Sequence, residues 1–146
     1  MKINIDQSEH YEEIEITIKC NSLTDDLLKL ISYAKLMDNK ITGFKDKSAF
    51  IINYDEIYYF ETVENKTFIY CKSNVYECNL KLYEIEELLK NFMFFRCSKS
   101  TIVNLKKVKI LKSLFNSKVE ITLDNDEKII VNRQYIALLK EKFNIN

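Results

Sequence analysis

The sequence predicts a mainly β fold, α+β overall, in a chain of 146 residues that is short enough for one compact body. The first observation behind this prediction is the alternation of apolar and polar residues over many short stretches, which is typical of half-buried strands. The second is that only three stretches repeat their apolar residues at helical spacing. The third is a hydrophobic content of 47%, which is enough for a folded core.

The front of the chain predicts a strand followed by a helix. Residues 12–20, EEIEITIKC, alternate charged and apolar residues as a half-buried strand does. Residues 22–37 predict a helix, because Ser22 is a candidate N-cap and acidic residues follow it in the first turn. We therefore expect residues 1–44 to form an acidic βα extension.

The rest of the chain predicts a strand-rich body that ends in a helix. The expected strands are residues 49–53, 57–61, 67–72, 75–80, 101–103, 107–112, 118–123 and 128–131. The expected helices are residues 82–91 and 133–142. Because the chain has one glycine and no proline, Asn, Asp and Ser must supply most of the turns.

Composition excludes several classes of protein. No apolar stretch is long enough to span a bilayer and the N-terminus lacks the pattern of a signal peptide, so we expect a cytoplasmic protein without direct membrane insertion. The sequence has no glycine-rich phosphate loop, which argues against a nucleotide-binding fold. A single histidine and the absence of a CxxC motif argue against a metal site. We expect no cofactor and no enzymatic activity, because no two carboxylates converge as an acid–base pair.

Charge is concentrated in one part of this neutral chain. Residues 96–119 contain seven Lys or Arg and no Asp or Glu. A solvated lysine face is one interpretation of this run. The other is a surface for a polyanion, since each phosphate that a cation neutralises releases condensed counterions. The length of the acid-free stretch favours the polyanion, and a basic face that meets an acidic protein partner is the alternative.

Four short motifs between residues 55 and 135 resemble those of the LytTR DNA-binding domain family. They are a strand at Asp55–Glu61, a Phe-Arg motif at Phe95–Asn104, a turn at Asp124–Glu127 and an Asn-Arg pair opening the last helix at Asn132–Tyr135. The resemblance covers residues 45–143 and implies that residues 45–146 form a LytTR-like domain. Such a domain is an elongated stack of antiparallel sheets that reads major grooves of duplex DNA with loop side chains. A sequence-specific transcription regulator is therefore the expected function.

The resemblance also assigns roles to individual residues. Base-reading side chains are expected in three loops, at Lys66, Thr67, Ser98, Lys99 and Arg133. Contacts to the DNA backbone, or support of the loops, are expected of Asn65, Arg96, Ser100, Asn104, Lys106, Lys107 and Lys109. Arg133 is the one reader whose planar fork can bond a guanine twice. For Arg96 and Asn104, buried hydrogen bonding that fixes a loop is the competing interpretation.

Two features depart from the family pattern, and the extension raises a further question. Asn132 stands where the family usually has Ser, and Asp126 stands at the usual turn glycine. The 44-residue extension is too short to form a phosphorylated receiver domain. In this it resembles the stand-alone LytTR regulators, which often pair with a membrane protein. We expect the extension either to cover a sheet edge or to form a homodimer on DNA.

Overall fold

The computed structural model describes residues 1–145, except for the side chain of Leu36. The helices are α1 (Asp25–Leu36), α2 (Leu82–Leu88) and α3 (Arg133–Lys142). The strands are β1 (Lys40–Lys45), β2 (Ser48–Asn53), β3 (Ile57–Val63), β4 (Lys66–Cys71), β5 (Val75–Cys78), β6 (Phe94–Arg96), β7 (Thr101–Asn104), β8 (Val108–Leu114), β9 (Lys118–Leu123) and β10 (Lys128–Val131). Single 3-10 turns precede β3 and β8. The predicted mainly β fold is confirmed.

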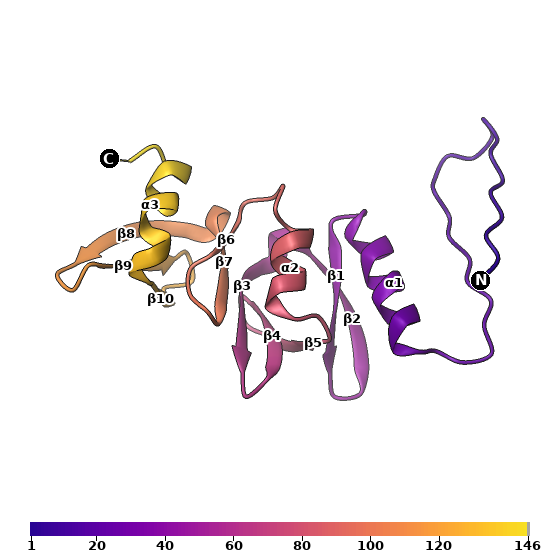
Figure 1. Ribbon diagram of the computed structural model, residues 1–146, viewed down its shortest axis with the longest axis horizontal. Coiled ribbons are helices and arrows are strands. Elements are labelled where there is room, and N and C mark those ends of the chain that lie inside the picture. Colours follow the sequence, from indigo (N-terminus) through magenta and orange to yellow (C-terminus); the bar gives the residue numbers. More distant parts are fainter. Residues whose placement is uncertain (146) are drawn as a thin grey trace.

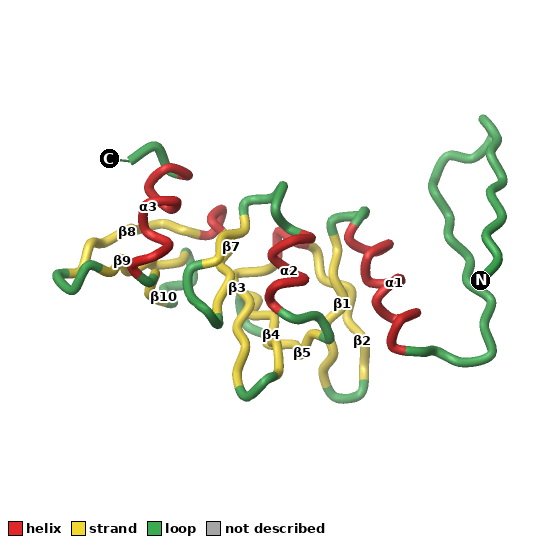
Figure 2. Tube along the Cα trace, viewed as in Figure 1, coloured by secondary structure: helices red, strands yellow, loops and turns green. Residues whose placement is uncertain are grey.

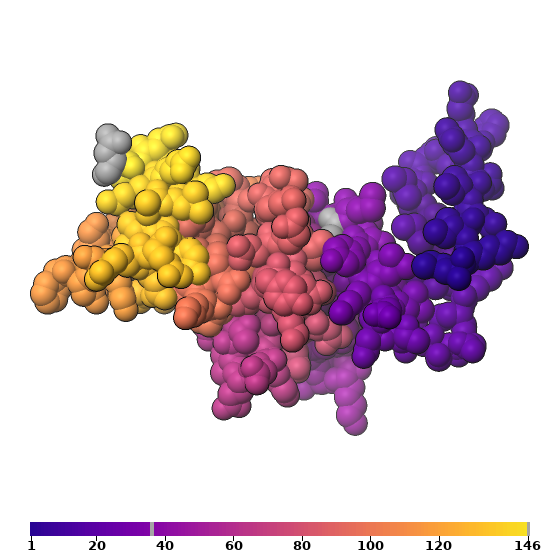
Figure 3. All heavy atoms as spheres, in the orientation of Figure 1, coloured from indigo at the N-terminus to yellow at the C-terminus, as the bar shows by residue number. Residues whose placement is uncertain are grey.

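The strands form two antiparallel sheets that follow one another along an elongated body (Figures 1 and 2). The larger sheet has seven strands in the order β2-β1-β5-β4-β3-β7-β6, and the smaller has three in the order β10-β9-β8. Helix α2 contacts β3, β6 and β7 of the larger sheet, whereas α3 contacts β9 of the smaller one. Figure 3 shows the N-terminal arm, residues 1–23, projecting from the end opposite α3.

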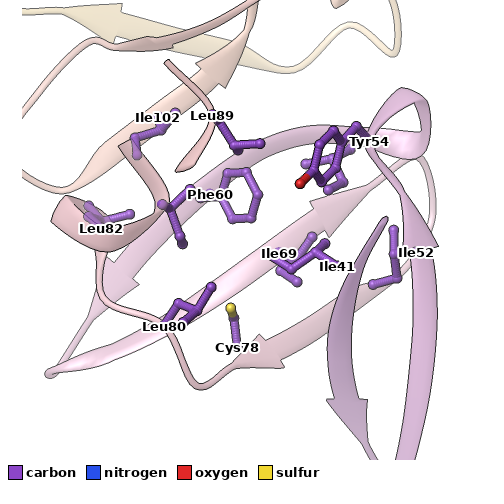
Figure 4. Close-up of a cluster of buried hydrophobic side chains, with 12 residues drawn as sticks. Ile41, Ile52, Tyr54, Phe60, Ile69, Cys78, Leu80, Leu82, Leu89 and Ile102 are labelled. Atoms are coloured by element: carbon purple, nitrogen blue, oxygen red, sulfur yellow. The ribbon is translucent and has the colours of Figure 1, made fainter. Parts of the chain in front are cut away.

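Two apolar cores hold these layers together. The first lies between the larger sheet and α2, where Phe60, Ile69 and Ile85 are fully buried. Figure 4 shows Phe60 and Ile69 of the sheet in this core together with Leu82 of α2. The second joins Val103 of the larger sheet to the smaller sheet and to Leu139 of α3. Burial of each such side chain contributes about 1.5–3 kcal/mol. The two cores therefore fix both sheets, α2 and α3 to one another, and the loops between the strands are held by this packed structure.

Tight turns are made without glycine. Asp46 and Lys47 join β1 to β2 with φ of 51° and 65°, and Glu64 and Asn65 join β3 to β4 with the same pair of values. Two consecutive residues of positive φ give the turn whose twist matches a hairpin. The single glycine, Gly43, instead lies inside β1, where an added Cβ would come within 2.6 Å of the Cβ of Tyr76. It is needed for close packing and not for a turn.

The front of the chain differs from its prediction. The expected strand at residues 12–20 is wrong, because residues 1–23 contain no strand. The helix begins at Asp25, and Thr24 instead of Ser22 is its N-cap, accepting a hydrogen bond of 3.2 Å from the Leu27 amide.

Strands β1 and β6 were not predicted, and β1 lies within the span expected to form the extension. It pairs with β2 over six residues and meets β5 at Phe44. Helix α1 packs beside β1, where the Lys35 ammonium donates to the Thr42 hydroxyl at 3.0 Å. The extension therefore contributes a strand to the larger sheet. No helix within residues 1–145 is long and apolar enough to cross a membrane.

Candidate nucleic-acid interface

Three loops from distant parts of the sequence are joined by backbone hydrogen bonds. The amide of Thr62, near the β3–β4 turn, donates to the carbonyl of Ser100 in the β6–β7 loop at 2.8 Å. The amide of Asn132, just before α3, donates to the carbonyl of Cys97 at 2.9 Å. The β3–β4 turn, the β6–β7 loop and the start of α3 therefore adjoin one another, along the lower edge of the body in Figure 1. We call this the loop surface.

Each of these loops presents an exposed cation. Lys66 is the first residue of β4, Lys99 lies in the β6–β7 loop, and Arg133 is the first residue of α3. No ion pair is recorded for any of the three among residues 1–145. Lys99 and Arg133 share a shallow depression that Asn132 and Gln134 also line. The positive end of the α3 dipole adds to the charge there.

Arg96 holds the β6–β7 loop in place. Its Nε donates to the carbonyl of Ser98 at 2.6 Å and its Nη2 to the carbonyl of Lys99 at 2.5 Å. Its Nη1 donates to Glu86 of α2 at 2.8 Å, and the Arg96 side chain is only 21% exposed. Each side of the guanidinium is thus occupied within the protein. The geometry is that of a clamp on the loop that carries Lys99.

Asn104 uses both ends of its amide inside the protein. Its Nδ2 donates to the Ile57 carbonyl at 2.8 Å, and its Oδ1 accepts from the Lys106 amide at 3.0 Å. The residue is 1% exposed. It therefore ties β3 to the 3-10 turn that follows β7.

The remaining residues expected on the loops divide into exposed and buried ones. Asn65 is exposed in the β3–β4 turn, and the Ser98 hydroxyl accepts from the Ser100 amide at 3.2 Å. Thr67, expected to read a base, is only 6% exposed and lies 3.4 Å from the Thr62 hydroxyl. Alternation along β4 turns Thr67 inward while Lys66 faces solvent. The structure thus brings Lys66 to the surface and withdraws Thr67 from it.

The lysines that follow Asn104 lie at the other end of β7 from the loop surface. Lys106 is 3.9 Å from the Asp55 carboxylate, and Lys109 is paired with Asp126. Lys107 lies 5.1 Å from the ring centroid of Tyr58 and is partly buried. Residues 96–119 contain no acid, but in the folded chain acids distant in the sequence approach this basic run and neutralise part of it.

Tyr58 and Asp124 complete the polar cluster around Lys107. The Tyr58 hydroxyl donates to the Asp124 carboxylate at 2.5 Å. This hydrogen bond, followed by burial, raises the pKa of Tyr58 to about 12. The Asp124 amide also donates to the Lys107 carbonyl at 2.8 Å. The cluster joins the larger sheet to the β9–β10 turn.

Neither a metal site nor a reactive thiol accompanies the loop surface. Within the described part of the chain, no three His, Cys, Asp or Glu residues group closely enough to hold a metal ion. Cys97, behind the loop, is fully buried and donates its thiol to the Thr101 carbonyl at 3.4 Å. Burial is the main cause that raises the pKa of Cys97 to about 12, although Arg96 acts in the opposite direction.

Sequence reasoning missed three residues that matter at this surface. Glu86 anchors the outer side of Arg96, and no local signal links a residue of α2 to the β6–β7 loop. Asn132 and Gln134 line the depression beside Lys99. Their position next to Arg133 at a helix start was a signal that could have pointed to them, since polar residues there face whatever approaches the helix N-terminus.

The fold and the loop surface define a β-rich domain with exposed cations on adjoining loops, a surface suited to a phosphate backbone. The amino-acid sequence shows to which protein family this domain belongs. Residues 47–144 match the LytTr DNA-binding domain, and the chain belongs to this family. The expected resemblance is confirmed, and membership of a DNA-binding family agrees with the expectation of a non-enzymatic protein.

Individual relatives support the same assignment. The chain is 26% identical over 147 residues to an uncharacterised HTH-type transcriptional regulator of Staphylococcus aureus (strain NCTC 8325 / PS 47), a match that covers 99% of each chain. It is 27% identical over 97 residues to the sensory transduction protein LytT of Enterococcus faecalis (strain ATCC 700802 / V583), covering 66% of this chain and 40% of that one. A solved LytTr DNA-binding domain from Bacillus cereus shares the fold, with a TM-score of 0.68 and 23% identity over 72% of this chain and 96% of that one. Although the first relative is described as HTH-type, strands separate every pair of successive helices within residues 1–145 of this chain.

Proposed function

We propose that this protein is a cytoplasmic transcription regulator that recognises a specific sequence in double-stranded DNA through its loop surface. The observation that carries this proposal is the placement of Lys66, Lys99 and Arg133 on three adjoining loops without ion pairs among the described residues. Family membership supports DNA as the ligand, and the description of the Staphylococcus aureus relative supports regulation of transcription.

The three cations have different roles in this proposal. Arg133 bonds one guanine twice, because a planar guanidinium matches the O6 and N7 acceptors of that base. Lys66 and Lys99 are single-point donors that contact a guanine or a neighbouring phosphate. Asn65 and Ser98 lie at the margin of the same surface and add polar contacts. The loops enter the major groove, because only that groove presents a distinct pattern for each base pair.

The buried residues support the readers and do not touch DNA. Arg96 fixes the carbonyls of the β6–β7 loop, so Lys99 is held in position before DNA arrives. Asn104 and Thr67 have the same supporting role within β7 and β4. Lys106, Lys107 and Lys109 contribute to the long-range field instead of contacting phosphates, because they lie at the opposite end of β7 and acids or a ring engage them.

Salt dependence of binding to duplex DNA tests the proposal. Each phosphate contact steepens the fall of log K with log salt by about 0.9, so Lys99→Ala should flatten the slope by roughly one unit. Arg133→Ala should cost about 1–3 kcal/mol on the specific site and relax the preference at one base position. Lys142→Ala, at the far end of the helix that Arg133 begins, is the matched control and should leave both quantities unchanged.

Two results would contradict the proposal. One is an affinity for duplex DNA that does not change with salt, which would favour the alternative of a basic face for an acidic protein. The other is a loss of the specific-to-random affinity ratio in Lys107→Ala but not in Arg133→Ala. That result would place the reading surface at the other end of β7.

A further inference from the structure

The N-terminal arm has the residue pattern of a strand but no strand partner in the structure. Ile14, Ile16 and Ile18 alternate with polar residues and are 85%, 60% and 38% exposed. Alternating β-branched residues are typical of a strand with one face buried. Because alternate residues of a strand point to the same face, these three exposed isoleucines would form one apolar face in an arm that became a strand, and an assembled protein would cover such a face.

The larger sheet ends in an open edge near α1, the helix that follows the arm (Figure 1). Strand β2 pairs with β1 on one side, and among the described strands nothing pairs with its other side. Its sequence, SAFIIN, has no charged residue, and Phe50 and Ile51 are 40% and 53% exposed. A charge-free apolar edge of this kind is a template for the addition of another strand.

The arm and this edge carry opposite charge. Residues 1–23 contain five acidic residues and two lysines. The β1–β2 hairpin, residues 40–53, contains three exposed lysines and one aspartate. The hairpin lysines Lys40, Lys45 and Lys47 make no ion pair recorded among residues 1–145. The acidic side of an added arm would thus lie beside a basic hairpin.

We propose that residues 12–19 of one copy pair with strand β2 of a second copy, and that the two copies exchange their arms reciprocally. Figures 1 and 3 show the arm directed away from the sheet beyond α1, so its own β2 is reached only if the arm reverses at Thr24. A second copy meets the arm without this reversal.

Reciprocal exchange makes one patch of surface complementary to itself, as a two-fold dimer requires. Backbone hydrogen bonds supply the affinity of an added strand, and the alternating side chains supply its register. The inference does not depend on how the loop surface reads DNA, because the arm and β2 lie at the opposite end of the body from α3. It assigns both roles considered for the extension, edge cover and dimerisation, to one contact.

The mass of the full chain in solution tests this inference. Sedimentation of the parent protein should show a dimer that weakens as salt is raised. Ile16→Asp should give a monomer with an unchanged melting temperature, because Ile16 is exposed in the single chain. Thr17→Asp adds the same charge on the other face of the arm and should remain dimeric. A parent protein that is monomeric at high concentration, or an Ile16→Asp protein that stays dimeric, would overturn the inference.

A peptide of residues 12–19 identifies the surface that receives the arm. The full-length Ile16→Asp protein should bind this peptide and become protected from hydrogen exchange over residues 48–53. The same peptide carrying Ile16→Asp should not bind. Protection at any edge other than β2 would refute the assignment. Protection of residues 12–19 in a monomeric parent would show instead that the arm folds onto its own chain.

Discussion

Replacing Arg96 should weaken DNA binding even though its side chain does not reach the DNA in the proposed arrangement. The guanidinium holds two successive carbonyls of the β6–β7 loop, those of Ser98 and Lys99, at 2.6 and 2.5 Å. In Arg96→Ala the loop loses both contacts and Lys99 is no longer held beside Arg133. The change therefore acts on the reader through the loop.

The contacts set the size of this effect. Hydrogen bonds from a charged donor contribute about 1.5–3 kcal/mol each, and the partial exposure of Arg96 favours the lower value, so the loss of the two loop contacts should lower the free energy of unfolding by about 3 kcal/mol. Ordering a residue costs about 1–2 kcal/mol, so if the two residues whose carbonyls Arg96 holds, Ser98 and Lys99, become free, ordering them again on binding should cost roughly 2–4 kcal/mol. At about 1.4 kcal/mol per tenfold, affinity should fall roughly thirty- to seven-hundredfold.

Fluorescence anisotropy with a labelled duplex at fixed salt measures this loss, at a temperature where urea denaturation shows each variant folded. Arg96→Lys should bind as weakly as Arg96→Ala, because an ammonium has no planar fork to span two carbonyls. Glu86→Gln keeps both loop contacts and should bind nearly as the parent does. If Arg96→Lys restores parent affinity, Arg96 acts as a charge on a phosphate and the clamp is refuted.

The other predictions concern stability and one acidic loop residue. Asn104→Ala should lower the free energy of unfolding in urea by about 2–4 kcal/mol, because it leaves the Ile57 carbonyl and the Lys106 amide without their hydrogen-bond partner. A loss below about 0.5 kcal/mol would rule out the supporting role. Glu64→Asn should raise that free energy by up to about 1 kcal/mol, since Asn tolerates positive φ, and should raise DNA affinity by removing an acid beside Lys66; a lower affinity would place this turn away from phosphates. The raised pKa of Tyr58 contributes stability that is complete below the unfolded value of 10.0 and is lost as pH rises through about 12. The stability difference between the parent and Tyr58→Phe should thus be constant near neutral pH and shrink above pH 10, and a difference that grows there would contradict the Asp124 hydrogen bond.

Much of the fold follows from period and turn signals in the sequence. Strands β3, β4 and β9 and helix α3 have long, regular patterns, and tertiary contacts preserve them. The β1–β2 hairpin was not fully predicted because its turn residues, Asp46 and Lys47, lack the usual Asn-Gly signal. A residue pattern also cannot supply a partner, so residues 12–20 alternate like a strand and yet pair with nothing in one chain.

The loop surface was predictable only in part. Motifs pointed to Lys99 and Arg133 separately, and the fold brings them into one depression. The orientation of Thr67 depends on the exact end of a strand, where an error of one residue exchanges buried and exposed faces. The partners of the basic run come from Asp55, Glu86 and Asp126, and their approach is a property of the folded chain alone.

Because those acids reach the basic run only on folding, the unfolded chain should bind nucleic acid in a different way from the native protein. Before folding, residues 96–119 are a continuous polycation that any nucleic acid attracts, and Asp126 is synthesised only after the run is complete. Folding pairs Lys106 and Lys109 and leaves the unpaired charge of Lys99 on the loop surface. Discrimination between DNA sequences is in this sense acquired together with the tertiary structure. Partly unfolded molecules should retain attraction to nucleic acid while losing all preference among sequences.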